Sequence, residues 1–403
     1  MTRVAVIGGG VIGTVAAFRL RQRGFAVTLI DPDPDWRGAS RGNAGHIAAD
    51  EVHPLASRAT LTGLPRSLFL CGGPVGLPLR DIGAWLPFGL RLAAATRRYE
   101  AGHRALTSLQ AEALPAWKRL VEALDAPDLL REQGHFVVWD RPESAAAGKA
   151  ALARAGTGGT AWRDAEAEEL ALLSSLSRPP GGAVRFSGTG QITDLTGLAE
   201  TLVARFEAAG GIRLRGTAWI EEAGVRLDSG ERIEADLILV AAGPASGALL
   251  KPVGHRVPLI AERGYHIEAA GGDWPADMPS ILFADRAVFV TRFTHRLRAT
   301  GFVEFGRMRS PPDPRKWRRL RTHARALGLP FAEPVAEWMG ARPTLPDYLP
   351  AIGRSRRQPR LLYAFGHQHL GLTLAAITGE CMAALAADEA APVDLAPFAI
   401  ERF

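Results

Sequence analysis

The stretch VAVIGGGVIGTVAAFRLRQRGFAVTLIDPDP, which begins at Val4, limits the fold of this chain more than any other segment. It is typical of an apolar strand, a glycine turn, a helix and a second strand that ends in an acid. Gly8 permits the tight turn, Gly10 lets the backbone approach a pyrophosphate, and Gly13 lets the helix pack closely on the strand. Asp31 would accept hydrogen bonds from ribose hydroxyls. The stretch therefore predicts a dinucleotide site, but it leaves NAD and FAD open because both share the same adenosine diphosphate end.

Length and cysteine content limit the class of protein. A chain of 403 residues with 47% hydrophobic content exceeds the usual size of one core, so we expect two domains or one elaborated domain. Cys71 and Cys381 are too few for a disulfide framework, and neither has a metal-ligand spacing, so we expect free thiols and no metal. The first strand begins at Arg3 with no leader pattern before it, and we expect a cytoplasmic protein.

The net charge is +6, and the positive charge comes almost entirely from arginine. The sequence has no zinc-finger spacing and no RNA-recognition signature, so nucleic acid is not expected as a partner. One basic segment, DPRKWRRLRTHARALG, places Trp317, Leu320, Ala324 and Leu327 on one face of a predicted helix. It can be a solvated surface helix, or it can contact an anionic membrane peripherally, at the inner membrane. The apolar stretch from Leu64 to Arg98 is interrupted by charges and is not predicted to span a membrane.

The remaining segments predict an α/β chain. Helices are expected in the alanine- and leucine-rich region from about Asp81 to Ala126, and DLTGLAETLVARFEAAGG is predicted as a helix capped by Asp194. LILVAAG and LLYAFG are typical of buried strands, and LTLAAITGECMAALAADEA of an amphipathic helix. The alternating segments ERGYHIEA, AVFVTRF and LRATGFVEF predict an antiparallel sheet, and WMGARPTLPDYLPAIGRS is predicted as a proline-rich loop.

Six motifs in order identify a family resemblance. They are the glycine motif, SRGNAG, the AAG at Ala241 to Gly243, RGYH, GARPTLPDYLPAIG and GHQHLGLTLAAITG. The small residues of SRGNAGH, from Ser40 to His46, suit the far end of the pyrophosphate and the ribityl chain of a flavin. With these motifs the chain resembles, nearly end to end, the D-amino acid oxidase superfamily of FAD-dependent oxidoreductases. The resemblance is to bacterial D-amino acid dehydrogenases and the D-hydroxyproline dehydrogenases near them in particular.

The resemblance implies a noncovalent FAD. GHQHLGLT would pass under the isoalloxazine, and the last helix would direct its amino end at the flavin C2 carbonyl. No cysteine lies between Ala341 and Gly353, so covalent attachment of the sarcosine oxidase kind is not expected. The implied fold has a Rossmann-like FAD-binding domain (1–75, 192–250 and 335–403) and a second, α+β substrate domain built on an antiparallel sheet (76–191 and 251–334). The expected cofactor residues are Gly8, Gly10, Val11, Ile12, Gly13, Asp31, Ser40, Arg41, Asn43, Ala44, Gly45, His46, Ala218, Ala242, Gly243, Gly366, His367, His369, Leu370, Gly371, Leu372 and Thr373.

Arg342 is the expected anchor for a substrate carboxylate, since a guanidinium binds a carboxylate through two parallel hydrogen bonds. The alternative is a structural ion pair with Asp347. Tyr265 and His266 are neighbours on a predicted strand, so their side chains point to opposite faces, and the resemblance favours Tyr265 as the one near the flavin.

Three histidines, His46, His367 and His369, lie in predicted cofactor loops. Each can contact the flavin or the substrate, or can simply pack the cofactor. His46 and His369 are expected at the reaction centre with Arg342 and Tyr265.

The predicted reaction is dehydrogenation of D-amino acids, with cyclic D-proline and hydroxy-D-proline types ranked first. A hydride would pass from the α-carbon to flavin N5, and the imine would be hydrolysed or remain cyclic. The expected electron acceptor is a quinone or another respiratory chain component. The alternatives are an oxygen-using glycine or sarcosine oxidase, the flavin domain of a tRNA-modifying enzyme, and a flavoprotein without turnover. The motifs leave the oligomeric state open.

Overall fold

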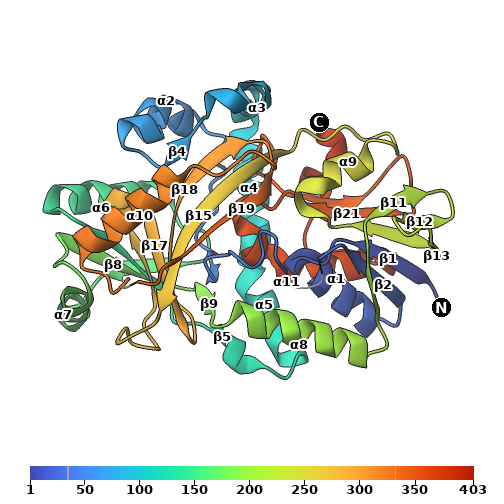
Figure 1. Ribbon diagram of the computed structural model, residues 1–403, viewed down its shortest axis with the longest axis horizontal. Helices are drawn as coiled ribbons and strands as arrows, with labels where there is room; N and C mark the ends of the chain where they lie inside the picture. Colours follow the sequence, from blue (N-terminus) through green and yellow to red (C-terminus); the bar gives the residue numbers. More distant parts are fainter. Residues whose placement is uncertain (34–35, 332) are drawn as a thin grey trace.

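The protein is described by a computed structural model that covers residues 1–33, 36–331 and 333–403. Two lobes lie side by side, and each is built on one large sheet (Figure 1). The chain passes between the lobes several times, so each lobe collects segments that are far apart in the sequence.

The first lobe contains a six-stranded sheet in the order β10-β2-β1-β14-β21-β20. Its strands are parallel except for β20, which runs antiparallel to β21. The strands β1, β14 and β21 are almost entirely apolar and buried, as expected for a sheet covered on both faces. The bounds are β1 Arg3–Ile7, β2 Ala26–Asp31, β10 Ile212–Arg215, β14 Leu237–Val240, β20 Ala351–Arg354 and β21 Leu361–Phe365.

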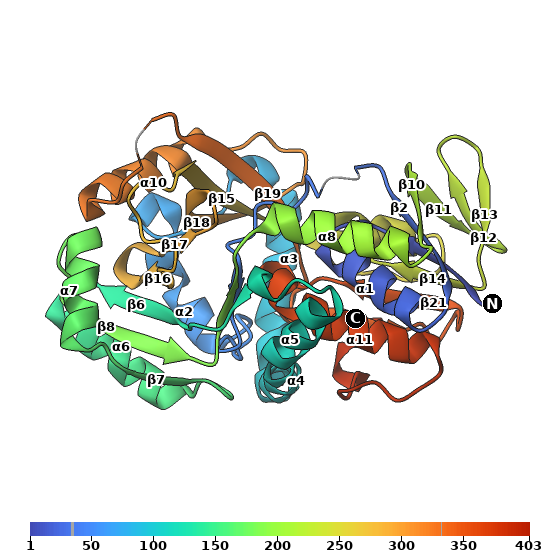
Figure 2. The same ribbon diagram turned by 90° about the horizontal axis from the view of Figure 1, so that it is seen from below.

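Helices cover one face of this sheet and a small sheet covers the other. The helical layer shares one core and consists of α1 Val11–Gln22, α4 Tyr99–Ala111, α5 Ala113–Ala123, α8 Leu195–Ala208 and α11 Gly371–Ala386. Figure 2 shows α4 and α5 in the middle of the molecule beside α11. The opposite face packs against β11 Ala218–Glu221, β12 Gly224–Leu227, β13 Arg232–Glu234 and α9 Ser246–Leu250.

The second lobe contains a nine-stranded sheet in the order β19-β15-β18-β17-β16-β6-β8-β7, with β4 paired to β18. As predicted, β15, β17 and β18 are antiparallel neighbours. The bounds are β4 Val75–Gly76, β6 His135–Trp139, β7 Ala161–Asp164, β8 Gly182–Ser187, β15 Ile260–Ala270, β16 Ser280–Phe283, β17 Val288–Arg292, β18 Arg296–Gly306 and β19 Ala336–Thr344.

Helices α7 and α10 share a core with one face of the nine-stranded sheet, and a three-stranded sheet, β3-β9-β5, joins the lobes. The bounds are α2 Arg58–Ser67, α3 Ile82–Ala95, α6 Pro142–Ala155, α7 Ala167–Leu176, α10 Pro314–Leu327, β3 His46–Ile47, β5 Leu130–Arg131 and β9 Gly190–Ile192. The predicted cap of α8 is confirmed, since Asp194 accepts a hydrogen bond from the Thr196 N–H at 2.9 Å.

Three predictions about segments need correction. The segment predicted as a proline-rich loop contains β19, because Pro343 is tolerated in a strand at the edge of a sheet. β19 also lies in the second lobe, although 335–403 was assigned to the FAD-binding domain. Conversely, α4 and α5 pack into the core of the first lobe, although 76–191 was assigned to the substrate domain.

Two helices differ from their predicted surroundings. Nearly all of α11 is buried, so it is a core helix rather than an amphipathic one. The helical stretch Gln368–Ala386 has the length and apolar composition to cross a membrane, but 78% of its most apolar window is buried inside the protein. The apolar face of α10, formed by Trp317, Leu320, Ala324 and Leu327, is buried against the second sheet and is therefore not free to contact a membrane.

Candidate active site

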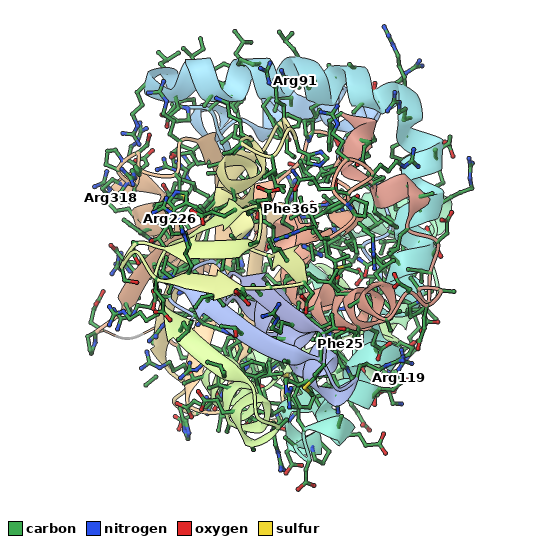
Figure 3. The ribbon with its side chains drawn as sticks, turned by 90° about the vertical axis from the view of Figure 1, so that its right-hand side faces the viewer. Phe25, Arg91, Arg119, Arg226, Arg318 and Phe365 are labelled. Atoms are coloured by element: carbon green, nitrogen blue, oxygen red, sulfur yellow. The ribbon has the colours of Figure 1, made fainter. Side chains whose placement is uncertain are left out.

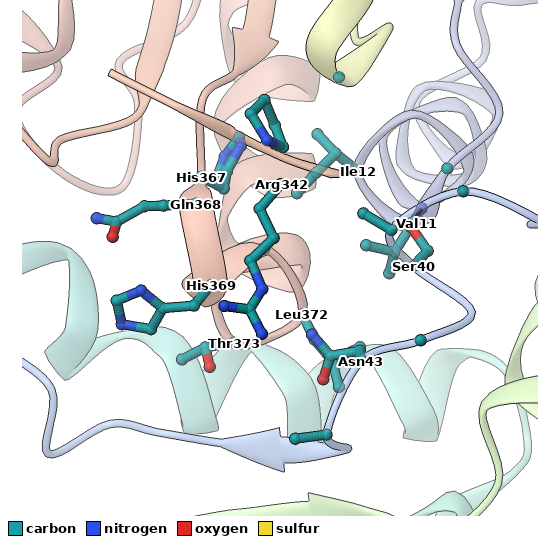
Figure 4. A pocket seen from close by; sticks show the side chains of 18 of the residues that line it. Val11, Ile12, Ser40, Asn43, Arg342, His367, Gln368, His369, Leu372 and Thr373 are labelled. Carbon is teal, nitrogen blue, oxygen red and sulfur yellow. Dashed lines mark hydrogen bonds between the residues drawn. The ribbon is translucent and has the colours of Figure 1, made fainter. Parts of the chain in front are cut away.

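A cavity of about 520 Å³ lies between the glycine turn of the first lobe and the open face of the nine-stranded sheet. Figure 4 shows part of its wall. Seventeen of the predicted site residues line it: Gly8, Gly10, Val11, Ile12, Asp31, Ser40, Asn43, Ala44, His46, Ala242, Gly243, Arg342, His367, His369, Gly371, Leu372 and Thr373. Segments from the start, middle and end of the chain therefore converge on one cavity.

The glycine turn leaves bare backbone at the cavity. Gly8 has φ +114°, and a Cβ there would lie 2.4 Å from the Ala241 carbonyl oxygen. A Cβ at Gly13 would lie 1.8 Å from the Gly8 carbonyl oxygen, so α1 approaches β1 as closely as predicted. Gly13 itself does not line the cavity. The Val11 N–H, at the start of α1, donates to Ser40 Oγ at 3.0 Å.

Asp31 closes the end of β2 beside this turn. Its Oδ2 accepts the Gly9 N–H at 2.6 Å and its Oδ1 accepts the Asp33 N–H at 2.7 Å. Burial raises the pKa of the Asp31 carboxyl, and these two N–H groups oppose that rise. The carboxylate is thus fixed by backbone with lone pairs left over, which suits two ribose hydroxyls.

The segment Ser40 to His46 is held by the second lobe. Arg298 on β18 donates to the carbonyl oxygens of Arg41, at 3.1 Å, and of Asn43. Thr291 on β17 donates to the Ala44 carbonyl oxygen at 2.7 Å. Because these carbonyls point away from the cavity, the segment presents small side chains and amides to it.

The amino end of α11 forms part of the cavity wall. Thr373 Oγ1 accepts the Ala48 N–H at 3.1 Å, which ties this end of α11 to the residue just after β3. His367 is buried and its Nε2 lies 3.1 Å from Thr378 Oγ1. Burial lowers the pKa of His367 to about 3, so its imidazole is neutral.

These residues fit an extended dinucleotide that carries a flavin. The cavity wall contains a glycine turn for the pyrophosphate and an acid for a ribose. It also contains a run of small residues and the amino end of a helix. Gly10 lines the cavity, and a Cβ there would approach only Ser40 Oγ, at 3.1 Å. Room for a ligand is therefore left where a side chain would otherwise project.

Arg342 projects from β19 into the cavity, and Figure 4 shows its guanidinium between His369 and Asn43. Its Nη1 lies 3.3 Å from Glu262 Oε1, and Glu262 Oε2 also accepts the hydroxyls of Thr344 at 3.0 Å and Tyr348 at 3.3 Å. Burial raises the pKa of Tyr348 well above its ordinary value, and the Glu262 carboxylate raises it further. The acid that holds Arg342 is therefore Glu262.

The alternative partner, Asp347, is engaged elsewhere. Arg402 Nε lies 2.6 Å from Asp347 Oδ2. The alternative interpretation, an ion pair of Arg342 with Asp347, is therefore wrong, and the structural acid beside Arg342 is Glu262.

His369 lies beside Arg342 and forms an ion pair with Glu51. Burial lowers the pKa of His369, but the Glu51 carboxylate outweighs this effect and the net pKa is raised.

A further polar group surrounds Asp50. His46 Nε2 lies 3.8 Å from Asp50 Oδ1, and His135 Nε2 lies 4.0 Å from Asp50 Oδ2. The side-chain atoms of these three residues that could bind a metal all lie within 4.8 Å of one another. The sequence analysis expected no metal site and did not identify this cluster.

The prediction that Tyr265 faces the flavin is wrong. Tyr265 is buried in the core on the far side of the sheet, where its ring contacts Trp317 and its hydroxyl accepts the Asp313 N–H at 3.0 Å. His266 is on the cavity side of the strand, as alternation requires. It does not reach the cavity because Trp338 stacks on it with ring centroids 4.9 Å apart.

The other predicted residues that do not line the cavity are Arg41, Gly45, Ala218, Gly366 and Leu370. Ala218 is buried in the core between β11 and the six-stranded sheet, where its side chain packs rather than contacts a ligand. The structure adds wall residues that were not predicted: Asp50, Glu51, His135, Leu282, Phe289, Thr300, Trp338 and Gln368. Asp50 and Glu51 lie only four and five residues after His46, so their place at the site could have been predicted from the sequence. His135 comes from the distant strand β6, and no sequence pattern connected it with the site.

Comparison with known proteins agrees with this geometry. A family model described as FAD dependent oxidoreductase, abbreviated DAO, matches residues 3–385. A protein named D-amino-acid oxidase from Bradyrhizobium diazoefficiens is 30% identical, over 99% of this chain and 98% of that protein. D-amino acid dehydrogenase 2 from Ralstonia nicotianae is 31% identical, over 99% of this chain and 100% of that protein.

Solved structures share the fold. Glycine oxidase from Geobacillus kaustophilus superposes with a TM-score of 0.76 at 21% identity, over 100% of both chains. L-proline dehydrogenase from P. horikoshii superposes with a TM-score of 0.74 at 15% identity, over 100% of this chain and 97% of that chain.

Proposed function

Because this chain belongs to the FAD-dependent oxidoreductase family and oxidises amino acids, we propose that it binds FAD noncovalently and that its substrates are D-amino acids. Among them we rank cyclic ones of the D-proline and hydroxy-D-proline type first, and a quinone or another respiratory component as the electron acceptor. The enzyme is then a dehydrogenase that acts on CH–NH or CH–NH₂ groups.

One observation carries the proposal: Arg342 lies in the same cavity as the glycine turn and the amino end of α11. A guanidinium that is held by a buried acid on one side keeps its other N–H groups for a ligand carboxylate. An amino acid bound this way is fixed in position and orientation.

Bound FAD supplies a hydride acceptor at the flavin ring. The chain itself binds and aligns the substrate: Arg342 holds the carboxylate, while Leu282 and Phe289 from the nine-stranded sheet exclude water from the side-chain end. Alignment and desolvation of this kind account for a large part of such a rate enhancement.

The preference for D-amino acids is supported by the names of the Bradyrhizobium and Ralstonia relatives, which are 30% and 31% identical to this chain. The preference for cyclic substrates is supported by the segments SRGNAGHIAADEVHPLAS and GHQHLGLTLAAITGE, which resemble the hydroxyproline-type dehydrogenases. A second candidate is an oxidase that uses oxygen, which the name of the Bradyrhizobium relative favours.

The test is an anaerobic screen of D- and L-amino acids and cyclic imino acids with the purified, FAD-loaded enzyme. We expect D-amino acids to bleach the yellow absorption band and their L-enantiomers to leave it unchanged. Oxygen consumption compared with dye reduction then separates oxidase from dehydrogenase. A colourless protein that cannot take up FAD would refute the whole assignment.

A further inference from the structure

The side chains of His46, Asp50 and His135 form a second polar group in the cavity, distinct from Arg342. They come from β3, the loop after it and β6, and all three line the cavity wall. His46 Nδ1 lies 3.2 Å from the Gly190 carbonyl oxygen and therefore donates to it, because a carbonyl oxygen only accepts. The other ring nitrogen of His46, Nε2, lies 3.8 Å from Asp50 Oδ1.

The carboxylate of Asp50 lies between the two imidazoles. Burial lowers the pKa of His135 to about 3, so this imidazole is neutral. Burial raises the pKa of Asp50, but His46 and His135 outweigh it and the net pKa is lowered, so the carboxylate is charged. Asp50 Oδ1 is buried and has no hydrogen-bond partner among the described residues. A buried acceptor without a donor is costly, and a ligand that donates hydrogen bonds would remove that cost.

The spacing indicates what kind of ligand fits. Zinc binds nitrogen and oxygen at about 2.0–2.2 Å, which places tetrahedral ligands about 3.4 Å apart. A nitrogen or oxygen that donates hydrogen bonds of about 2.8 Å places its acceptors about 4.0–4.6 Å apart. The separations of 3.8 and 4.0 Å exceed the zinc value and are close to that of the hydrogen-bond donor.

We propose that His46, Asp50 and His135 form a specificity subsite for a hydrogen-bond donor on the amino acid substrate. The donor would be a ring hydroxyl or a side-chain ammonium, at the end of the molecule opposite the carboxylate that Arg342 holds. This inference rests on the proposed function, because it assumes that an amino acid occupies the cavity.

The experiment compares substrate pairs that differ only in the donor. The pairs are hydroxy-D-proline with D-proline, and D-lysine with D-norleucine. With the wild-type holoenzyme we expect kcat/KM to be at least ~10-fold higher for the donor-bearing member of one pair. Asp50→Asn, which turns one acceptor oxygen into an NH₂ donor, should bring that ratio close to one. Asp277→Asn, an exposed position that does not line the cavity, should keep the wild-type ratio.

Each other outcome has a defined meaning. If the wild-type enzyme oxidises both members of each pair equally, the subsite is refuted but the proposed function stands. The same conclusion follows if Asp50→Asn lowers kcat/KM for both members by the same factor. Stoichiometric zinc binding that Asp50→Asn abolishes would show a metal site in its place. If none of the four amino acids bleaches the flavin, the proposed function fails and the subsite with it.

A second, independent observation concerns α3. Leu79, just before the helix, and Ile82, Leu86 and Leu90 within it are 81%, 44%, 46% and 66% exposed. Their spacing of three or four residues places them on one face. The opposite face packs inward, where the Phe88 and Phe305 rings lie 5.8 Å apart. Figure 3 shows the helix that carries Arg91 along the upper edge of the molecule, with side chains directed outward.

Arginine predominates around this face. Between residues 52 and 99 the chain has six arginines, all exposed, and a single acid, Asp81, which is 1% exposed. The six are Arg58, Arg66, Arg80, Arg91, Arg97 and Arg98. A cavity beside the carboxyl end of α3 adds Lys251 and Arg256 to this basic surface. A second copy of the chain would bring these like charges together, so self-association through this face is disfavoured.

We infer that α3 attaches the protein to an anionic membrane surface, with Leu79, Ile82, Leu86 and Leu90 inserted among the lipid headgroups and the arginines paired with lipid phosphates. An exposed apolar stripe flanked by arginines has the chemistry of an interfacial helix. The helix that performs this role is α3, whereas the sequence had suggested α10, whose apolar face is buried.

Vesicle flotation of the holoenzyme tests this inference. We expect binding to vesicles of phosphatidylglycerol mixed with phosphatidylcholine, little binding to phosphatidylcholine alone, and weakening by salt. The double variant Leu86→Ser, Leu90→Ser should bind at least ~10-fold more weakly, because two inserted apolar side chains are lost. Leu172→Ser, at an exposed leucine of α7, is the matched control and should bind like the wild type.

Two results would overturn the inference. One is a double variant that binds the anionic vesicles as tightly as the wild type. The other is a wild-type protein that ignores the vesicles and forms a dimer that the double variant dissociates, which would assign the face to a second copy.

Discussion

Arg342 and Glu262 lie directly opposite each other on the paired strands β19 and β15, with Nη1 3.3 Å from Oε1. The Glu262 side chain is 3% exposed and that of Arg342 is 23% exposed, so the acid is buried beneath the base. The pair fixes the Arg342 guanidinium beside the edge strand of the nine-stranded sheet, where it lines the cavity.

Replacement of Arg342 should impair substrate use far more than cofactor binding. Arg342→Leu removes the carboxylate partner, and the loss of a buried charged hydrogen-bond pair costs about 2–5 kcal/mol. We expect kcat/KM for the best D-amino acid to fall by roughly 30-fold to several thousand-fold. Steady-state kinetics with measured flavin content tests this, with Arg309→Leu at an exposed position as control. Unchanged kinetics would exclude Arg342 as the anchor.

Glu262 should act through Arg342. Glu262→Gln keeps the shape and both hydroxyl contacts but removes the charge that holds the guanidinium, so Arg342 becomes less well oriented. We expect KM to rise by about 10-fold with a smaller change in kcat, since ground-state binding is lost. A comparable rise for Glu262→Asp would argue for a packing role instead, because the charge is then retained.

Asp31 should control cofactor affinity. Asp31→Asn weakens the acceptor for the ribose hydroxyls, and a hydrogen bond to a charged group contributes about 1.5–3 kcal/mol. We expect the Kd for FAD to rise by roughly 10- to 150-fold in a titration that follows quenching of flavin fluorescence. Asp277→Asn should leave the Kd unchanged. An equal Kd for Asp31→Asn and the wild type would mean that the ribose is held elsewhere.

His367 should make the protein acid-sensitive. Burial lowers its pKa to about 3, below the value of about 6.5 in an unfolded chain. A depressed pKa contributes stability that is present above pH of about 6.5 and is lost as the pH falls from there toward 3. His367→Gln should therefore flatten the fall of Tm with decreasing pH, whatever its effect at pH 7. His295→Gln, at an exposed histidine, should leave the slope as it is; parallel curves for both variants would contradict the prediction.

The nucleotide half of the molecule could be predicted because its signals are local. The glycine spacing, Asp31 and the buried strands LILV and LLYAF each occupy a short stretch, and the physics that requires them acts within that stretch. The same holds for the Asp194 cap, whose hydrogen bond spans two residues.

The substrate side was less predictable because its contacts are distant in sequence. His135 meets Asp50 only through the fold, and Glu262 meets Arg342 through strand pairing across 80 residues. Alternation placed Tyr265 and His266 on opposite faces, but it did not show that Tyr265 lies on the core side or that Trp338 stacks on His266 and keeps it out of the cavity. The three prolines after Arg342 suggested a loop, but only Pro343 lies within β19, where an edge position removes the penalty.

The hydrogen bonds from Arg298 and Thr291 to the backbone of 41–44 make the second lobe part of the cofactor site. The two lobes are consequently not exchangeable modules: a fragment that retains the glycine turn and the final helix but lacks β17 and β18 loses the side chains that orient this segment. The yellow colour of bound flavin would therefore develop only after both lobes have folded. A substrate lobe grafted from another protein would have to supply equivalents of Arg298 and Thr291 before its effect on substrate specificity could be measured.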